Sequence, residues 1–321
     1  MIYRLTHLTR YDYQAAVDLS IHLAHLTPRA LPWQQVGAAT LATDPPLSWR
    51  RDVTDHFGNR QSWLFVDVPH ATLTVTATAE VTRTAPAPPG GAHAWDALPV
   101  PPAVAEFALS SPLAPAHPEA GAWAAASFPP GRPVAAATLA LTQRIFASFR
   151  FRPGVSTVAT PVGETLARRE GVCQDFTHLM LAMLRQLGVP ARYVSGYIRT
   201  RPPPGGTRRL GADQSHAWVS VWDGAGWFDL DPTNGIAVAD EHVTLAWGRD
   251  YADIAPLRGL ILGGGGQALS VSVALEEIGG DQAATLATAA PVNRSSAAAE
   301  VRNTCRGDPA AAQIGSSASR S

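Results

Sequence analysis

Lysine is absent from the sequence. All 25 basic residues are arginines, scattered along the chain, and with 26 acidic residues they give a formal net charge of −1. Binding to nucleic acid or to an anionic membrane needs a basic patch or stripe, so we expect neither partner. The absence also leaves no ε-amine for a Schiff base, for a phosphate-binding loop or for isopeptide cross-linking of this chain's own side chains.

Cysteine is scarce as well, and long apolar runs are absent. The two cysteines, Cys173 and Cys305, lie far apart and make no disulfide framework. Cys305 lies in a polar segment without a helix pattern, and we assign it no role. No window approaches the ~20 consecutive apolar residues of a membrane helix. The first residues, MIYRLTHLTRYDYQ, place polar side chains where a secretory signal needs an apolar stretch. We therefore expect a cytoplasmic protein with reduced cysteines.

Composition changes divide the chain. With 46% hydrophobic residues, its 321 residues suffice for two domains with sizeable cores. Residues 1–84 alternate apolar and polar positions, as in LFVDVPHATLTVTATAEVTR, and predict an antiparallel β-sandwich-like domain or half-barrel. Residues 85–133 are rich in Pro, Ala and Gly and predict a linker of irregular structure, with one helix around 104–109. Residues 279–321 contain few large apolar side chains and predict a disordered tail.

The remaining segment, 134–278, begins with a predicted helix over about 134–148, followed by a second helical region. The sequence REGVCQDFTHLMLAMLRQLGVPARYVSGYI then predicts a buried helix that ends before Gly188 and turns into a strand. The apolar residues on one face of this helix recur at helical spacing: Phe176, Leu179, Met180, Met183, Leu184 and Leu187. Two further strands, SHAWVSVW and GWFDLDP, flank a turn at 223–226 and predict a β-hairpin.

Cys173 lies where a loop meets the start of the buried helix, which we expect at Gln174 or Asp175. The unpaired N–H groups and the positive dipole end there favour a thiolate, and the same groups can receive the oxyanion formed when sulfur attacks a carbonyl. Gly171 lets a substrate chain approach, and Gln174 directly follows the sulfur, so we expect both to contact substrate. The alternative, a small buried apolar cysteine, fits poorly with the polar residues that follow. No second cysteine or histidine stands at zinc-ligand spacing, so no metal is expected.

Two of the ten histidines are candidates for the base that a cysteine nucleophile needs. His178, five residues after Cys173, is rotated by roughly 140° on the helix, so a packing role is expected. His216 begins a strand and shares one face with Trp218, while the intervening alanine and valines form the core face. Trp218 is therefore a candidate for a substrate groove, although most tryptophans in a domain of this size belong to the core.

A third group must hold the histidine. If the hairpin turns at residues 224–225, Trp218 pairs with Asp231. Asp231 then lies diagonally from His216, at roughly 7 Å between Cβ atoms. Asp229 is one strand step further away. A register slip of one residue would place the Asp231 carboxylate on the opposite face of the hairpin. Asp231 also precedes a proline, a position at which aspartate commonly begins a turn.

At these residues the sequence resembles the bacterial transglutaminase-like superfamily, whose catalytic core is similar to that of papain-type thiol proteases. The segment GVCQDFTHLMLAMLRQLGVPARYVSGY resembles the family's nucleophile helix and following strand, and SHAWVSVWDGAGWFDLDPTNG resembles its histidine and aspartate strands. GRDYADIAP resembles a further family segment, and 1–84 resembles the β-rich N-terminal region of bacterial members. The resemblance covers about 1–278. It implies Cys173 as nucleophile, His216 as base and Asp231 as orienting acid. It also implies a papain-like α+β core in which the cysteine helix packs on an antiparallel sheet.

The expected reaction is acyl transfer on a peptide or protein substrate: Cys173 attacks a peptide or glutamine-type amide, His216 protonates the departing amine, and a thioester forms. If water releases the acyl group from the thioester, the protein is a peptidase or amidase. If an amine releases it, the protein is a transferase. Water needs no binding pocket and no acidic cluster near the motifs would attract a lysine, so we favour hydrolysis. Two alternatives are a non-catalytic protein-binding module and an arylamine acyltransferase, which would need an acyl-thioester cofactor. We expect no cofactor, and the oligomeric state is left open.

Overall fold

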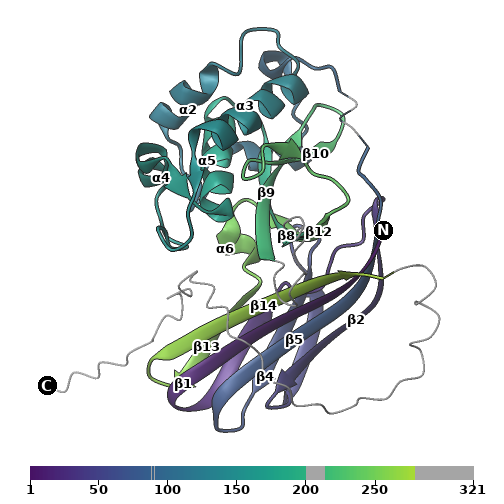
Figure 1. Ribbon diagram of the computed structural model, residues 1–321, viewed down its shortest axis with the longest axis vertical. Helices are drawn as coiled ribbons and strands as arrows, with labels where there is room; N and C mark the ends of the chain where they lie inside the picture. Colours follow the sequence, from purple (N-terminus) through teal and green to yellow (C-terminus); the bar gives the residue numbers. More distant parts are fainter. Residues whose placement is uncertain (88, 90, 200–213, 279–321) are drawn as a thin grey trace, which may run out of the picture.

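The computed structural model describes residues 1–87, 89, 91–199 and 214–278, which form two lobes (Figure 1). One lobe is a curled antiparallel sheet, and the other combines helices with a smaller antiparallel sheet. The predicted C-terminal tail, including Cys305, lies outside the described residues. Within the described ranges, no helix combines the length and the apolar character needed to cross a bilayer. The predicted α+β class is confirmed.

The lower lobe in Figure 1 is a seven-stranded sheet centred on its first strand. Its strands are β1 (Ile2–Ala24), β2 (Gln34–Asp44), β3 (Trp49–Thr54), β4 (Arg60–Val66), β5 (His70–Arg83), β13 (Leu257–Gly263) and β14 (Gln267–Glu277). The order is β2-β5-β1-β4-β3, and β13 and β14 also pair with β1. The first half of β1 pairs with β5 and β14, and its second half pairs with β4 and β13. All seven strands belong to one sheet, which is the half-barrel alternative of the sequence prediction.

The last two strands of this sheet come from the C-terminal part of the described chain. The sequence prediction grouped 257–277 with the core domain 134–278, whereas the structure pairs both strands with β1. An alternating pattern identifies a strand but not its partner, and without these two strands β1 would leave a long unpaired edge. The chain therefore passes from the sheet to the core and returns to the sheet.

The strand β1 buries two different sets of side chains along its length. In its first half the buried residues are odd-numbered and include Tyr3, Leu5, His7, Thr9 and Tyr13. The pairing with β13 is irregular between Val17 and Leu19. Beyond that point the buried residues include Ser20, His22 and Ala24. A bulge of this kind bends a strand and redirects its side chains, which lets one strand contribute to the whole inner face of the curled sheet.

The upper lobe contains a five-stranded antiparallel sheet in the order β11-β10-β9-β8-β12. Its strands are β8 (Ala191–Ile198), β9 (Gln214–Trp222), β10 (Trp227–Asp231), β11 (Ile236–Ala237) and β12 (His242–Gly248). The helices are α1 (Pro102–Ala105), α2 (Pro118–Ala125), α3 (Val134–Ser148), α4 (Val162–Arg168), α5 (Cys173–Gln186) and α6 (Tyr251–Ile254). The short remaining elements are the 3-10 turns Trp95–Ala97 and Glu106–Ala108 and the strands β6 (Arg150–Phe151) and β7 (Glu170–Gly171).

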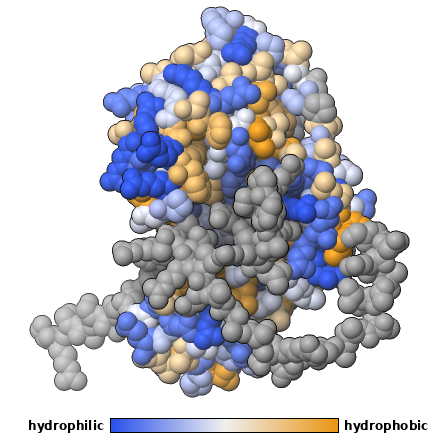
Figure 2. Space-filling view, in the orientation of Figure 1, coloured by the Kyte–Doolittle hydropathy of each residue, from blue (hydrophilic) through white to orange (hydrophobic). Residues whose placement is uncertain are grey.

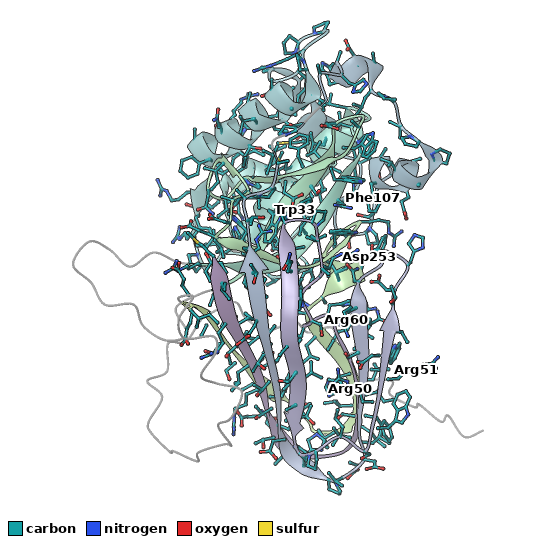
Figure 3. All side chains as sticks on the ribbon, turned by 90° about the vertical axis from the view of Figure 1, so that its right-hand side faces the viewer. Trp33, Arg50, Arg51, Arg60, Phe107 and Asp253 are labelled. Atoms are coloured by element: carbon teal, nitrogen blue, oxygen red, sulfur yellow. The ribbon has the colours of Figure 1, made fainter. Side chains whose placement is uncertain are left out.

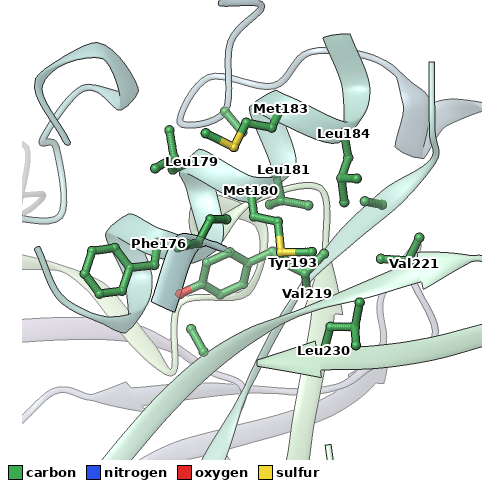
Figure 4. Close-up of a cluster of buried hydrophobic side chains, with 14 of the residues drawn as sticks. Phe176, Leu179, Met180, Leu181, Met183, Leu184, Tyr193, Val219, Val221 and Leu230 are labelled. Carbon is green, nitrogen blue, oxygen red and sulfur yellow. The ribbon is translucent and has the colours of Figure 1, made fainter. Parts of the chain in front are cut away.

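The helix α5 packs its apolar side against this sheet, as the sequence predicts. Figure 4 shows its side chains beside those of Tyr193, Val219 and Leu230, and all of them belong to one buried cluster. Of the six predicted apolar positions, all are buried except Leu187, which is half-buried. The helix begins at Cys173 itself, slightly earlier than predicted. It ends before Gly188, whose φ of +76° suits the chain reversal. The predicted papain-like arrangement of helix on sheet is confirmed.

Residues 85–133, predicted as an irregular linker, contribute to the same core. The predicted helix around 104–109 is present as α1 and the 3-10 turn that follows it. The helix α2 packs on α5 and buries Ala120 completely. A Cβ at Gly121 would lie 2.4 Å from the side chain of Gln186, so small residues are needed for this close approach. The Ala-rich composition here reflects tight helix packing, which composition alone does not distinguish from a linker.

Charged side chains of the lower lobe include arginines on the edge strand β3 and on its neighbour β4. Figure 3 shows Arg50, Arg51 and Arg60 along β3 and β4, away from the upper lobe. Arg50 is paired with Asp52 at 3.0 Å. Hydrophilic and hydrophobic side chains are interspersed over the face shown in Figure 2.

Candidate active site

Cys173 is the first residue of α5 and lines a cavity between the two lobes. The cavity has a volume of about 270 Å³ and is bounded by Cys173 and His216 on one side and by residues of β1, β13 and β14 on the other. Cys173 is a half-buried free thiol. The first backbone hydrogen bond of the helix runs from Phe176 N to Val172 O. The preceding N–H groups therefore lack intrahelical partners and place positive potential beside the sulfur.

His216 and Asp231 meet on adjacent strands. Trp227 pairs with Trp222, so the hairpin register predicted from the turn is confirmed. His216 Nε2 lies 2.7 Å from Asp231 Oδ2, and both side chains are buried. Cys173 and His216 line the same cavity, and Cys173 is one of the groups that raise the pKa of His216. The structure thus places the predicted nucleophile and base on one cavity wall and the predicted acid in contact with the base.

The charges of these three residues reinforce one another. Burial alone would lower the pKa of His216, but the Asp231 charge and the hydrogen bonds to Asp231 and Cys173 outweigh it and raise the pKa to about 10. Burial alone would raise the pKa of Asp231, but the charge and hydrogen bond of His216, together with His242, hold it well below its usual value. At neutral pH an imidazolium is therefore paired with an ionised Asp231, and this imidazolium lines the same cavity as Cys173.

A second histidine, His242, also contacts Asp231 and was not identified from the sequence. His242 is buried, and its Nε2 lies 3.1 Å from Asp231 Oδ2. Asp231 Oδ1 accepts from the backbone N–H groups of Thr233 and Asn234 at 2.9 and 3.2 Å. The side-chain amide of Asn234 donates to Oδ2 at 2.6 Å. The carboxylate is thus fixed from several directions. No local sequence signal identifies His242, because β12 is separated from β10 by two other strands.

Trp218, predicted to contact substrate, lies behind the site instead. It is fully buried and is not among the residues that line the cavity, so this prediction is wrong. Its ring packs against His242 with centroids 5.3 Å apart, and its Nε1 donates to Asp229 Oδ2 at 3.1 Å. A Cβ at Gly196 would lie 2.4 Å from the Trp218 ring. The missing side chain of Gly196 therefore leaves the space that the indole fills beside the histidines.

The other two residues predicted to contact substrate, Gln174 and Gly171, differ in their position relative to the cavity. Gln174 lines the cavity, and its Nε2 donates to the carbonyl oxygen of Val158 at 3.1 Å. Its contact with substrate stays a prediction. Gly171 is buried and does not line the cavity. A Cβ at Gly171 would lie 2.9 Å from Asp175, whose Oδ2 accepts from the N–H of Val172 at 2.7 Å. Gly171 therefore allows Asp175 to cap the helix, in place of the predicted contact with substrate.

His178 is buried, in agreement with the predicted packing role. Its Nε2 accepts the N–H of Tyr251 at 3.3 Å, and its ring centroid lies 5.0 Å from that of Tyr193. Burial lowers the pKa of His178 to about 4, so the ring is neutral at neutral pH. A neutral imidazole whose nitrogen is engaged in the core is unsuited to act as the base for Cys173.

A cluster of potential metal ligands coincides with the acid end of the site. His216, Asp231 and His242 each offer a ligand atom within 4.8 Å of the others. Their separations of 2.7 and 3.1 Å are hydrogen-bond distances. The other ring nitrogen of His242 accepts the N–H of Ala239 at 3.5 Å. The contacts are those of a hydrogen-bond network, and the expected absence of a metal stays a prediction.

Two family descriptions match the two lobes. Residues 3–82 match the bacterial transglutaminase-like N-terminal region, and residues 124–232 match the transglutaminase-like superfamily. The second range contains Cys173, His216 and Asp231. The match extends upstream of α3 into the segment that the sequence analysis treated as a linker, which agrees with the packing of α2 in the core.

Curated relatives extend along most of the chain. An uncharacterized protein of Mycobacterium tuberculosis is 40% identical over 274 residues, which is 81% of this chain and 87% of that protein. One of Mycobacterium leprae is 30% identical over 281 residues, covering 86% and 98%. A protein-glutamine gamma-glutamyltransferase of Pseudomonas aeruginosa is 36% identical over 97 residues, covering 28% and 14%. The crystal structure of a candidate cysteine protease from Cytophaga hutchinsonii shares the fold, with a TM-score of 0.67 at 21% identity over 87% of this chain and 92% of that one. The chain belongs to the bacterial transglutaminase-like superfamily.

Proposed function

We propose that this protein is a cysteine peptidase or amidase with Cys173 as nucleophile, His216 as proton carrier and Asp231 as orienting acid. The observation that carries the proposal is the hydrogen bond from His216 to the buried carboxylate of Asp231, on the wall of the cavity that Cys173 also lines. A nucleophile, a base within hydrogen-bond reach and a third group that holds the base are the parts that acyl transfer needs.

The reaction proceeds in two halves. First, the thiolate of Cys173 adds to the amide carbon, the C–N bond breaks, and the leaving nitrogen takes the proton carried by His216 Nδ1. The acyl group remains on sulfur as a thioester. His216, now neutral, takes a proton from water while the water oxygen attacks the thioester carbon. The C–S bond then breaks, which releases the carboxylic acid and restores the thiolate and imidazolium.

The charges around the cavity favour water over an amine as acceptor. Among the described residues that line it, Asp175 is the one carboxylate. Asp175 already accepts hydrogen bonds from Ser156 Oγ at 2.5 Å and from the N–H of Val172 at 2.7 Å. A protonated lysine side chain would therefore lose its hydration without gaining a free counter-charge on this wall. Water needs no such partner.

Amine transfer is the second candidate function, because one relative is named a protein-glutamine gamma-glutamyltransferase. The match covers 28% of this chain, so it supports a shared type of core more than a shared acceptor. The same thioester would form, and a primary amine would release it in place of water.

The test is mass spectrometry of a peptide library incubated with the full chain and a labelled primary amine. Cleaved peptides, or glutamine converted to glutamate, support hydrolysis, whereas incorporated label supports transfer. Cys173→Ala should abolish every product, and the matched control Cys305→Ala, which removes the other cysteine, should not. Identical products from the wild type and from Cys173→Ala would overturn the catalytic proposal and favour a binding module.

A further inference from the structure

Two polar side chains in the wall of the cavity have no hydrogen-bond partner. His22 and Tyr13, both on β1, line the same cavity as Cys173 and His216. His22 is 3% exposed and Tyr13 is 8% exposed. Within the described part of the chain, neither ring nitrogen of His22 and not the hydroxyl of Tyr13 finds a partner. The N-terminal sheet thus holds unused donors and acceptors in the wall of the cavity that Cys173 also lines.

A neighbouring histidine on the same wall, by contrast, has both of its ring nitrogens paired. His7, on the same strand and the same cavity wall, forms hydrogen bonds at 2.8 Å through both ring nitrogens, to Tyr197 and to Thr9. Buried polar groups are normally paired in this way, because an unpaired group gives up its hydration without compensation. If packing were the whole role of His22, an apolar residue would serve better. The unpaired atoms therefore point to a partner supplied from the cavity.

Aromatic rings surround these atoms. The ring of Tyr11 lies 6.0 Å from that of His22 and stacks on that of Tyr13 at 6.1 Å, and the ring of His70 lies 5.8 Å from that of Tyr13. His70 Nδ1 faces the carbonyl oxygen of Val68 at 2.8 Å, so Nδ1 carries the proton and Nε2 is an acceptor. The cluster combines flat apolar surfaces with hydrogen-bonding atoms of both kinds.

His22 and Tyr13 are uncharged at neutral pH. Burial, together with nearby His70, lowers the pKa of His22 to about 4. Burial, together with Tyr11, raises the pKa of Tyr13, so the phenol keeps its proton. Arg258, which also lines the cavity, is exposed, and it donates to a backbone carbonyl at 2.8 Å. A carboxylate or an ammonium group would find no counter-charge in this cluster, whereas a neutral polar group would lose little on entering it.

We infer that His22 and Tyr13 form a recognition subsite for an uncharged hydrogen-bonding group of the substrate, with a side-chain carboxamide as the best match. One end of the amide pairs with His22, either its NH₂ with the unprotonated nitrogen or its oxygen with the imidazole N–H, and the Tyr13 hydroxyl is available to the other end. The inference rests on the proposed function: the subsite holds an Asn or Gln side chain of the acyl-donor peptide while another carbonyl reacts at Cys173. It gives the N-terminal sheet a share in substrate selection.

Kinetics of the full chain on a positional peptide library tests the subsite. His22→Leu and Tyr13→Phe remove the polar atoms at similar volume. Ser20→Ala is the matched control, because Ser20 is also buried and unpartnered on β1 but does not line the cavity. None of the three changes breaks a hydrogen bond seen within the described residues, so the melting temperature should not fall.

The expected result is a preference for Asn or Gln over Leu, Met, Asp and Glu at one peptide position. His22→Leu and Tyr13→Phe should each lose about tenfold in kcat/KM for those peptides, mainly through KM, as the loss of one hydrogen bond implies. Ser20→Ala should keep the wild-type preference. Equal use of Asn and Leu peptides by the wild type, a preference for a charged side chain, or an unchanged preference in His22→Leu would overturn the subsite.

Peptide binding to the Cys173→Ala variant distinguishes a failure of the proposed subsite from a failure of the proposed hydrolysis. In one outcome the wild type turns over no peptide, but Cys173→Ala binds carboxamide peptides. If the double variant Cys173→Ala/His22→Leu then binds them about tenfold more weakly, the subsite stands and the proposed hydrolysis fails. If the wild type cleaves peptides without regard to the side chain, hydrolysis stands and the subsite fails. The absence of both turnover and binding overturns both.

Discussion

His242 donates to the Asp231 oxygen that also accepts from His216, at 3.1 Å against 2.7 Å. The two imidazoles come from different strands, β12 and β9, and the ring of Trp218 lies 5.3 Å from that of His242 and 6.1 Å from that of His216. His242 does not line the cavity. We therefore interpret it as a positioning residue, which acts on His216 through the carboxylate.

Replacement of His242 tests this role. His242→Phe keeps a ring but removes the donor, so we expect kcat to fall about tenfold with KM nearly unchanged, since a hydrogen bond to a charged group contributes ~1.5 kcal/mol or more. His242→Gln keeps an N–H donor and should restore part of kcat. Steady-state kinetics and thermal melts give both readouts. A purely structural role would lower the melting temperature of both variants without separating kcat from KM.

Asp175 fixes the start of the helix that carries Cys173. It is buried and accepts from Val172 N–H and from Ser156 Oγ. We expect Asp175→Ala to lower the free energy of unfolding by about 1–2 kcal/mol, as the loss of a helix cap does. We also expect it to slow the alkylation of Cys173 by iodoacetamide, because the first turn loses its geometry. Asp175→Asn, which keeps an acceptor oxygen, should lose less. Alkylation and unfolding at wild-type levels in Asp175→Ala would contradict this role of the cap.

Much of the candidate site could be predicted because its parts are encoded locally. The turn at 223–226 sets the register of the hairpin, and the register sets the diagonal relation of His216 to Asp231. The helical period of the apolar residues identifies α5 and its buried side. Cys173 at the start of that helix follows from the same pattern, to within one or two residues.

The features that could not be predicted depend on contacts between distant segments. His242 reaches Asp231 from a strand that no local pattern links to the hairpin. The wall that β1 contributes to the cavity follows from packing of the two lobes, which strand alternation does not report. Trp218 does share a strand face with His216, but Trp218 is covered whereas His216 reaches the cavity, and the alternating pattern cannot distinguish the two positions.

The histidines that are buried in the neutral form should limit stability in acid. Burial lowers the pKa of His7, His22 and His178 to about 4 in each case. Between pH 6.5 and about 4 the unfolded chain binds protons on these rings that the folded chain does not, so the free energy of unfolding falls as the pH falls. Each ring contributes up to about 1.4 kcal/mol per pH unit.

His216 has the opposite effect on the pH dependence of the free energy of unfolding, because its pKa is raised to about 10. Its contribution is fully present below pH 6.5 and is lost as the pH rises from 6.5 towards 10, so we expect maximal stability near pH 6.5. Denaturant midpoints across this range would measure the curve. His22→Leu should reduce the slope on the acid side, and Ser20→Ala should not. A midpoint that stays constant between pH 6.5 and 4.5 would refute the assignment of neutral buried rings.

The return of the chain to the N-terminal sheet predicts the effect of truncation. A chain that ends at residue 256 lacks β13 and β14, which pair with β1 over Val17–Ala24 and Tyr3–Tyr13. It also lacks Val273 and Leu275, which are buried in the same cluster as α5. We expect this chain to aggregate, because β1 then exposes an unpaired edge along most of its length.

A chain that ends at residue 278 is the matched control, since it keeps every described strand of the sheet. Size-exclusion chromatography and circular dichroism should find it folded and similar to the full chain. If the chain ending at 256 were equally monomeric, with an unchanged melting temperature, β1 would not need partners on both of its edges. The two returning strands would then be dispensable for the fold, and their role would reduce to forming one wall of the cavity beside Cys173.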